Sequence, residues 1–193
     1  MKRSETRILT THTGSLPRSA ELQELLRSRL DPVAGEAEEF NTGVEEGVVD
    51  VVAKQVAVGV DVINDGEQGR VQYATYVKDR LNGFDGEQIL RALPRIDMLD
   101  FPEFAAQSGV STSTTIPWPA CTGPISWKDK DAVQRDIQRL KDATSGVQAE
   151  EVFMTAASPG VIANFLHNEH YSTEEEYLYA LADVMKDDYK AIV

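Results

Sequence analysis

The first residues in the chain that could do chemistry lie in a turn containing glycine and proline. In His12–Arg18 (HTGSLPR), the residues His12, Thr13, Gly14 and Ser15 offer exposed backbone N–H groups, a hydroxyl and an imidazole. Such a turn suits the binding of a small carboxylate or an amino acid. The alternative is a tight strand-to-helix turn in which Ser15 only caps the following segment.

A second turn, Asp65–Arg70 (DGEQGR), carries two carboxylates close together. Asp65 and Glu67 favour a cationic partner, which would be a metal ion, an ammonium group or Arg70 itself. The alternative is a solvated acidic loop that pairs with Arg70.

Other motifs with chemical potential are weaker. His167 and His170 have a spacing that can bind a metal on a helix, but flanking Pro, Gly and Ser residues indicate a loop, and no third ligand is near in sequence. Cys121 either faces the site or is a buried, inert thiol. The sequence has no Walker loop, GxSxG elbow or GxGxxG fingerprint, so it gives no support to nucleotide binding or serine hydrolase chemistry.

These turns must be positioned by alternating strands and helices. Hydrophobic spacing predicts a helix over Asn41–Val58, capped by Asn41 or Thr42. The predicted strands are Arg7–Thr11, Val60–Asn64, Thr115–Cys121 and Glu151–Thr155. The other predicted helices are Ala20–Leu30, Ala74–Leu81, Ala132–Ala143 and Thr173–Ile192. This order predicts parallel strands joined by helices, with the turns gathered at the carboxyl ends of the strands. Residues 82–115, which contain Pro94 and Pro102, are expected to form an irregular insertion with a β-hairpin.

Composition narrows the class of protein. The 193 residues are 41% hydrophobic and 26% charged, with a net charge of −13, which predicts a single folded domain over 1–193. An acidic chain repels phosphate backbones and anionic lipids, so neither nucleic acid nor membrane is expected as a partner. One cysteine excludes an internal disulfide. The sequence shows neither an apolar signal region nor a membrane-length apolar run, so we expect a cytoplasmic protein.

Four motifs in order resemble one known family. TTHTGSLPR at 10–18, GVDVINDGEQGR at 59–70, CTGPISW at 121–127 and FMTAASPGVIANF at 153–165 resemble the catalytic barrel of cobalamin-independent methionine synthase, and in particular the single-barrel proteins of that superfamily. The resemblance implies a (β/α)8 TIM barrel that transfers a methyl group from a methylated folate to a thiol such as homocysteine. It also implies a zinc ion that binds the thiol and favours the thiolate.

The resemblance assigns roles to the two turns. It implies that Gly14 and Ser15 hold the amino acid substrate and that Glu67 binds its ammonium group. His12 and Asp65 are then neighbours of the substrate. These roles agree with the chemistry of the residues, because N–H groups donate to a carboxylate and a carboxylate attracts an ammonium group.

The chain departs from the family in its metal ligands. The zinc ligands of the family, a His-x-Cys pair, a Glu and a further Cys, lie in the second half of the barrel, and no His-x-Cys occurs here. A barrel needs roughly 250 residues, so we expect about the first half, with roughly four βα units and without a metal site of its own.

Three explanations are open: a truncated chain, half of a split enzyme, or a non-catalytic remnant. We favour a methyltransferase half that supplies the substrate-binding residues. The alternatives are a non-catalytic subunit and another thiol alkyl-transfer or decarboxylase-type reaction on a related barrel. An open sheet exposes its edges, so a partner half-barrel or self-association is expected.

Overall fold

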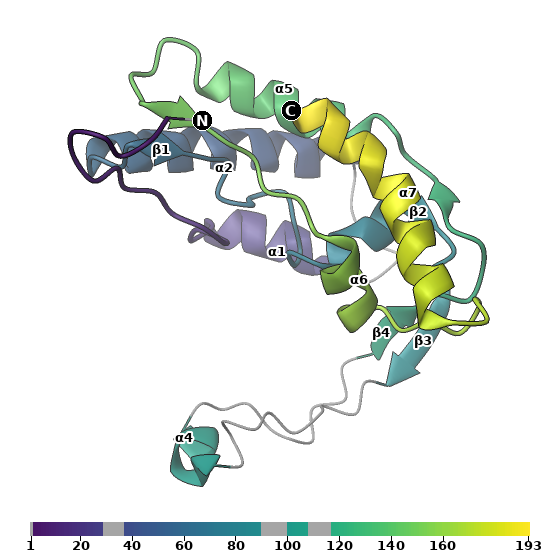
Figure 1. The fold of residues 1–193 in the computed structure, drawn as a ribbon. Helices are drawn as coiled ribbons and strands as arrows, with labels where there is room; N and C mark the ends of the chain where they lie inside the picture. The colour runs from purple at the N-terminus through teal and green to yellow at the C-terminus, as the bar shows by residue number, and fades with distance from the viewer. Residues whose placement is uncertain (1, 29–36, 90–99, 108–116) are drawn as a thin grey trace.

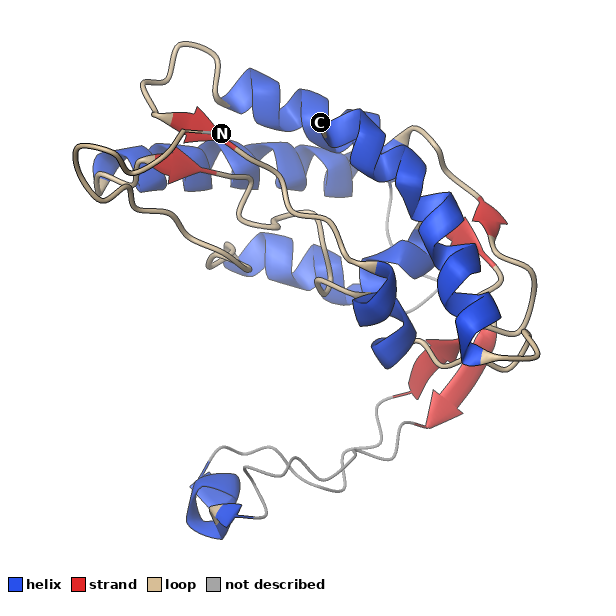
Figure 2. Cartoon of the chain, viewed as in Figure 1, coloured by secondary structure: helices blue, strands red, loops and turns tan. Residues whose placement is uncertain are grey.

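The computed structural model describes residues 2–28, 37–89, 100–107 and 117–193. Its parallel strands are short and lie beside the helices α2 (Ala37–Ala57) and α5 (Ala132–Ala143), as Figures 1 and 2 show. β1 (Val62–Ile63) pairs in parallel with β6 (Glu151–Val152). On its other side, Val62 forms a parallel bridge with Thr11. Within the described residues, the predicted first, second and fourth strands therefore lie side by side, as a parallel α/β fold requires.

The predicted third strand does not join this sheet. β4 (Pro117–Ala120) pairs antiparallel with β3 (Gly86–Ile89), and residues 115–116 lie outside the described residues. Two prolines in β4 remove N–H donors, which suits a short hairpin strand and not a central parallel strand. The described part of this segment thus forms a hairpin with residues of the expected insertion, and Cys121 after it forms an isolated parallel bridge with Asn168, not with β1 or β6. A second antiparallel pair joins β2 (Leu81–Asn82) to β5 (Ser126–Trp127).

The helices largely follow the hydrophobic spacing. They are α1 (Ala20–Ser28), α2 (Ala37–Ala57), α4 (Pro102–Gln107), α5 (Ala132–Ala143), α6 (Pro159–Phe165) and α7 (Glu174–Ile192), with a 3₁₀ turn η1 (Thr75–Asp79). α7 begins where predicted, because the Thr173 hydroxyl accepts a hydrogen bond from the N–H of Glu176. The predicted cap of α2 is wrong. The helix already begins at Ala37, and the Thr42 hydroxyl donates to the Glu38 carbonyl inside it.

Two apolar clusters hold these elements together. The valines on one face of α2 pack with α1, β1 and α5, and the cluster includes Leu22, Leu26, Phe40, Val44, Val48, Val52, Ile63 and Leu140. The second cluster joins η1 to α6 and α7 and includes Tyr76, Leu81, Ile162, Tyr177, Leu181 and Met185. Burial of each such side chain stabilises the fold by about 1.5–3 kcal/mol. β1 is thus packed against helices that precede it and a helix that follows it in the sequence.

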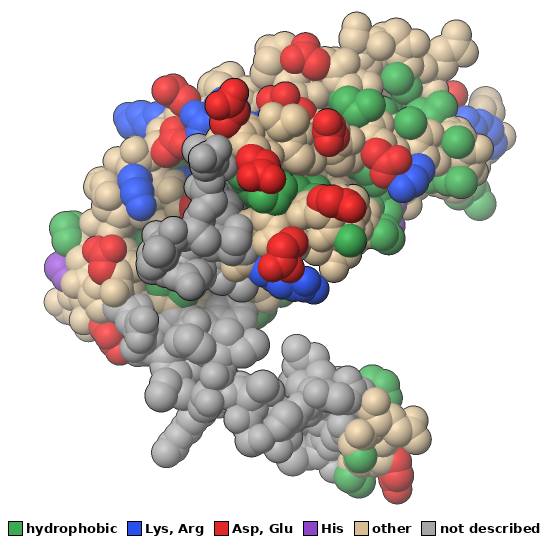
Figure 3. Space-filling model, turned by 180° about the vertical axis from the view of Figure 1, so that it is seen from behind, with side chains coloured by type: hydrophobic (Ala, Val, Ile, Leu, Met, Phe, Trp, Pro, Cys, Tyr) green, Lys and Arg blue, Asp and Glu red, His purple; other side chains and the backbone are tan. Residues whose placement is uncertain are grey.

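The surface reflects the acidic composition. Asp and Glu side chains are spread over the described surface visible in Figure 3, interspersed with Lys and Arg. Within the described residues, no helix has the length and apolar character needed to cross a membrane.

Candidate functional site

A cleft of about 370 Å³ opens where the parallel segments end. It is lined by Thr13, Gly14, Ser15, Glu67, Arg70, Tyr73, Thr155, Ala156, Ala157, Ser158 and Val161. Gly14, Ser15 and Glu67, which were predicted as substrate-binding residues, therefore meet in one cavity although more than 50 residues separate the two turns. A third side of the cleft is formed by residues 155–158, which come after β6 in the sequence.

Glu67 is the central charged group of the cleft. It is only 5% exposed. The Ser15 hydroxyl donates to its Oε2 at 2.8 Å, and the Thr155 hydroxyl donates to its Oε1 at 3.2 Å. Arg70 Nη1 lies 4.0 Å from the same Oε1. A buried carboxylate with donors at both oxygens is held in one orientation, which is what a binding group for a cationic ligand atom needs.

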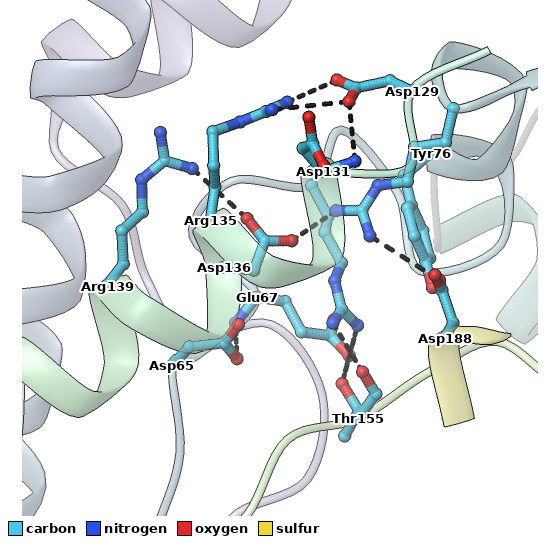
Figure 4. Close-up of polar contacts among 12 residues, drawn as sticks. Asp65, Glu67, Tyr76, Asp129, Asp131, Arg135, Asp136, Arg139, Thr155 and Asp188 are labelled. Atoms are coloured by element: carbon cyan, nitrogen blue, oxygen red, sulfur yellow. Dashed lines mark hydrogen bonds and ion pairs between the residues drawn. The ribbon is translucent and has the colours of Figure 1, made fainter. Parts of the chain in front are cut away.

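Arg70 holds Thr155 in place beside Glu67. Its guanidinium donates to the Thr155 hydroxyl at 2.8 Å and to the Thr155 carbonyl at 2.5 Å, and it lies over the Tyr76 ring at 4.8 Å. Figure 4 shows Glu67 and Thr155 facing each other across this contact. The Tyr76 hydroxyl accepts from the N–H of Ala157, and the Tyr189 hydroxyl donates to the Ala157 carbonyl. The segment after β6 is therefore anchored from η1 and α7.

The turn that carries Glu67 is positioned from α2. The buried Gln55 amide donates to the Asn64 carbonyl at 2.7 Å and accepts from the Asn64 N–H at 3.1 Å. The Asn64 side chain then accepts from the Gly66 N–H and donates to the His12 carbonyl. One asparagine at the end of β1 thus links the two turns.

Asp65 and His12, the other predicted site residues, do not line the cleft. Asp65 is buried and borders the interior beside Val44 and Asp136, where burial raises the pKa of its carboxyl. Its Oδ1 accepts from the Glu67 N–H at 3.0 Å, so it shapes the turn from behind. The His12 ring places its Nε2 in the interior without a hydrogen-bond partner among the described residues.

Thr155 and Tyr73 line the cleft but were not predicted as site residues from the sequence. Thr155 lies three residues after the end of β6 and is the last residue of the predicted strand Glu151–Thr155, so its position at a strand end was a usable signal. Tyr73 gave no such signal. Its ring forms an edge contact with Phe165, with centroids 5.5 Å apart, and lines one side of the cleft.

A second polar cluster includes Asp136, Asp188 and Tyr76 (Figure 4). Arg80 pairs with Asp136 on α5 and lies 3.8 Å from Asp188 on α7, and its guanidinium also lies over the Tyr76 ring, 4.6 Å from the ring centroid. Burial raises the pKa of the Asp188 carboxyl. These groups join α5, α7 and η1.

The residues considered for metal binding were also placed. Cys121 is fully buried, and burial raises the pKa of its thiol, which disfavours the thiolate. No group of three His, Cys, Asp or Glu side chains suited to a metal ion occurs in the described parts of the chain. These residues do not fit the zinc implied by the family resemblance, so no step of the chemistry is assigned to it here.

Comparison with known proteins supports the motif interpretation. Residues 8–92 match the family model described as the catalytic domain of cobalamin-independent synthase. The predicted family resemblance is confirmed. The chain is 24% identical over 184 residues to a methionine synthase of Sulfolobus acidocaldarius, a match that covers 95% of this chain and 48% of that protein. It is 35% identical over 77 residues to the 5-methyltetrahydropteroyltriglutamate–homocysteine methyltransferase of Cronobacter sakazakii, which covers 39% of this chain and 10% of that enzyme.

Solved structures agree on the fold. A B12-independent methionine synthase from Shewanella sp. W3-18-1, in complex with selenomethionine, superposes with a TM-score of 0.70 at 21% identity, over 95% of this chain and 47% of that one. A Listeria monocytogenes protein described as a putative vitamin-B12-independent methionine synthase gives a TM-score of 0.59. These likenesses confirm the barrel fold type. The chain spans about half the length of the methionine synthases that it matches along most of its own length.

Proposed function

We propose that this chain, as a single partial barrel over 1–193, supplies the amino-acid-binding part of a methionine-synthase-like methyltransferase. The reaction would move a methyl group from a methylated folate to a thiol such as homocysteine. In it the S–H proton is released, an S–C bond forms, and the C–N bond to the folate breaks as that nitrogen takes a proton. Zinc, which would favour the thiolate, would be held by residues other than those described.

The observation that carries this proposal is the buried Glu67 carboxylate in a cleft that also holds the first turn. A carboxylate oriented by Ser15 and Thr155 offers its remaining lone pairs to an ammonium group. In the first turn, the N–H groups of Gly14 and Ser15, two residues that also line the cleft, have no hydrogen-bond partner among the described residues. They are therefore available to the carboxylate of the same amino acid.

The rest of the cleft suits a short apolar side chain. Ala156, Ala157 and Val161 present methyl groups, and Tyr73 adds an aromatic surface beside them. Sulfur of a thiol or thioether makes favourable contacts with aromatic rings. The Shewanella relative, which was crystallised with selenomethionine, is consistent with this choice of ligand.

Binding of L-methionine and L-homocysteine, measured by titration calorimetry, tests the role of Glu67. Glu67→Gln removes the charge and keeps the shape, so we expect affinity to fall by about 10- to 100-fold, the equivalent of one charged hydrogen bond. Glu46→Gln, the same change at an exposed position on α2, is the matched control and should bind as the unaltered chain does. Equal affinity of the Glu67→Gln variant would contradict the proposal.

An open sheet edge supports a partner for this half. Among the described residues, no strand pairs with β6 on the side away from β1, and Val152 is 40% exposed there. Sheet edges of this kind accept a further strand. We propose that the remaining part of a barrel, or a second copy of this chain, covers it. Light scattering after gel filtration should show association, and Val152→Lys should weaken it. If the chain is a monomer at all concentrations and binds no polypeptide that contains the remaining part of a barrel, neither occupant covers this edge.

A further inference from the structure

We infer that Arg18 is a positioning residue for the Glu67 carboxylate, acting through the backbone of the turn and not through the ligand. This inference rests on the function proposed above and concerns the same cleft. Arg18 is not among the residues that line the cleft. It ends the first turn, and its guanidinium reaches the backbone of the second.

The guanidinium of Arg18 donates hydrogen bonds to three backbone carbonyl groups of one turn. Nη2 donates to the carbonyls of Glu67 and Arg70 at 2.7 and 2.8 Å, and Nε donates to that of Gln68 at 3.3 Å. The planar fork of arginine has several donors in fixed directions, which a lysine ammonium group lacks. Arg18 is therefore matched to the converging carbonyls of this backbone.

That backbone is strained, and Arg18 adds a donor from outside the turn to the one that the Arg70 N–H already gives to the Glu67 carbonyl at 3.1 Å. Glu67 has a φ of 56°, which makes it the one non-glycine residue of the described chain with positive φ, and it follows Gly66 at 60°. Left-handed conformation disfavours residues that carry a Cβ. The N–H groups of Gly66 and Glu67 are satisfied by the side chains of Asn64 and Asp65. Arg18 supplies the complementary donors for the carbonyls, so N–H and C=O groups are both held.

Two additional bonds join the same turns. The Leu16 N–H donates to the Gly66 carbonyl at 3.0 Å, and the Gln68 amide donates to the Leu16 carbonyl at 3.2 Å. These bonds fix the distance between the turns but do not touch the Glu67 carbonyl. Loss of Arg18 would leave the Glu67 carbonyl with only the bond from the Arg70 N–H at 3.1 Å. Glu67 is the residue with the strained conformation, so its carboxylate would be held less firmly between Ser15 and Thr155.

A double-mutant cycle on L-methionine binding tests the inference. Arg18→Ala should weaken binding at least tenfold when Glu67 is present and less than twofold in the Glu67→Gln background, because the effect passes through Glu67. Arg18→Lys keeps the charge and should restore only part of the affinity. Arg27→Ala, at an exposed position on α1, is the control and should bind unchanged. The same factor in both backgrounds, or no loss with Arg18→Ala, would overturn the inference.

Hydrogen exchange at residues 65–70 separates this inference from the proposed function. If the unaltered chain binds no methionine, the proposed function fails, and the exchange result alone then decides the role of Arg18. We expect exchange in this turn to rise at least tenfold in Arg18→Ala, and less in Arg18→Lys, while α7 stays unchanged. Should Arg18→Ala not fold, the comparison is made with Arg18→Lys. Exchange unchanged in the turn, or raised equally in α7, would refute the positioning role.

Discussion

Thr155 is the single residue whose alteration tests the construction of the cleft most directly. Its hydroxyl accepts from Arg70 Nη1 at 2.8 Å and donates to Glu67 Oε1 at 3.2 Å. The two charged groups are themselves 4.0 Å apart, and their side chains are 5% and 6% exposed. Thr155→Val keeps the shape of the side chain and removes the hydroxyl between the two charges.

The expected cost follows from these contacts. A hydrogen bond to a charged group stabilises a protein by about 1.5–3 kcal/mol, and two are lost. Arg70 keeps its bond to the Thr155 carbonyl and can move closer to Glu67, which offsets part of the loss. We therefore expect the free energy of unfolding to fall by about 2–4 kcal/mol, a large share of the roughly 5–15 kcal/mol typical of a domain.

Urea unfolding followed by circular dichroism at neutral pH measures this difference. Thr155→Ser, which retains the hydroxyl, should lose only about 1 kcal/mol from the missing methyl group. Thr144→Val is a further control, because the hydroxyl of Thr144 bonds only to uncharged helix carbonyls. A loss below about 0.5 kcal/mol for Thr155→Val would refute the view that this hydroxyl holds the buried pair together.

Two further changes probe the turn and its surroundings. Gly66→Ala should lower the free energy of unfolding by about 1–3 kcal/mol in urea, because φ is 60° and the new Cβ would lie 3.0 Å from the Leu16 side chain; Gly160→Ala, in open space, should be neutral. Arg7 donates to Asp61, with Thr10 as a second donor, and this holds the pKa of that carboxyl well below its usual range. Asp61→Asn should thus lower the melting temperature near pH 7, and the gap should shrink as pH falls below about 4, where the stabilisation by the carboxylate is lost. A gap that stays constant with pH would contradict this assignment.

The convergence of Gly14, Ser15 and Glu67 was predictable from local features. Each lies in a Gly-containing turn directly after a short apolar run, and the carboxyl ends of parallel strands meet at one edge. The segment Thr115–Cys121 has the same local appearance, yet Pro117–Ala120 within it pairs antiparallel with β3 in a hairpin. Hydrophobic pattern alone does not identify the partner of a strand, because that choice depends on residues far away in the sequence.

The orientation of side chains within the turn was beyond sequence reasoning. Asp65 and Glu67 look equivalent in the motif, but the positive φ at Gly66 and Glu67 places one carboxylate toward the interior and the other in the cleft. The contacts of Arg18 with this turn span 49–52 residues of sequence. Neither feature leaves a periodic signal, since both depend on the tertiary approach of two turns.

The balance of charge in the cleft bears on the kind of ligand more than the net charge of the chain does. The chain carries a net charge of −13, but exposed charges farther than about 8 Å are largely screened at physiological ionic strength. Within the cleft, Glu67 is paired with Arg70 at 4.0 Å, so the pair is neutral. A ligand with a single positive charge would be attracted to Glu67 and repelled by Arg70. A zwitterionic amino acid avoids this conflict, because its ammonium group can approach Glu67 while its carboxylate lies toward the N–H groups of the first turn.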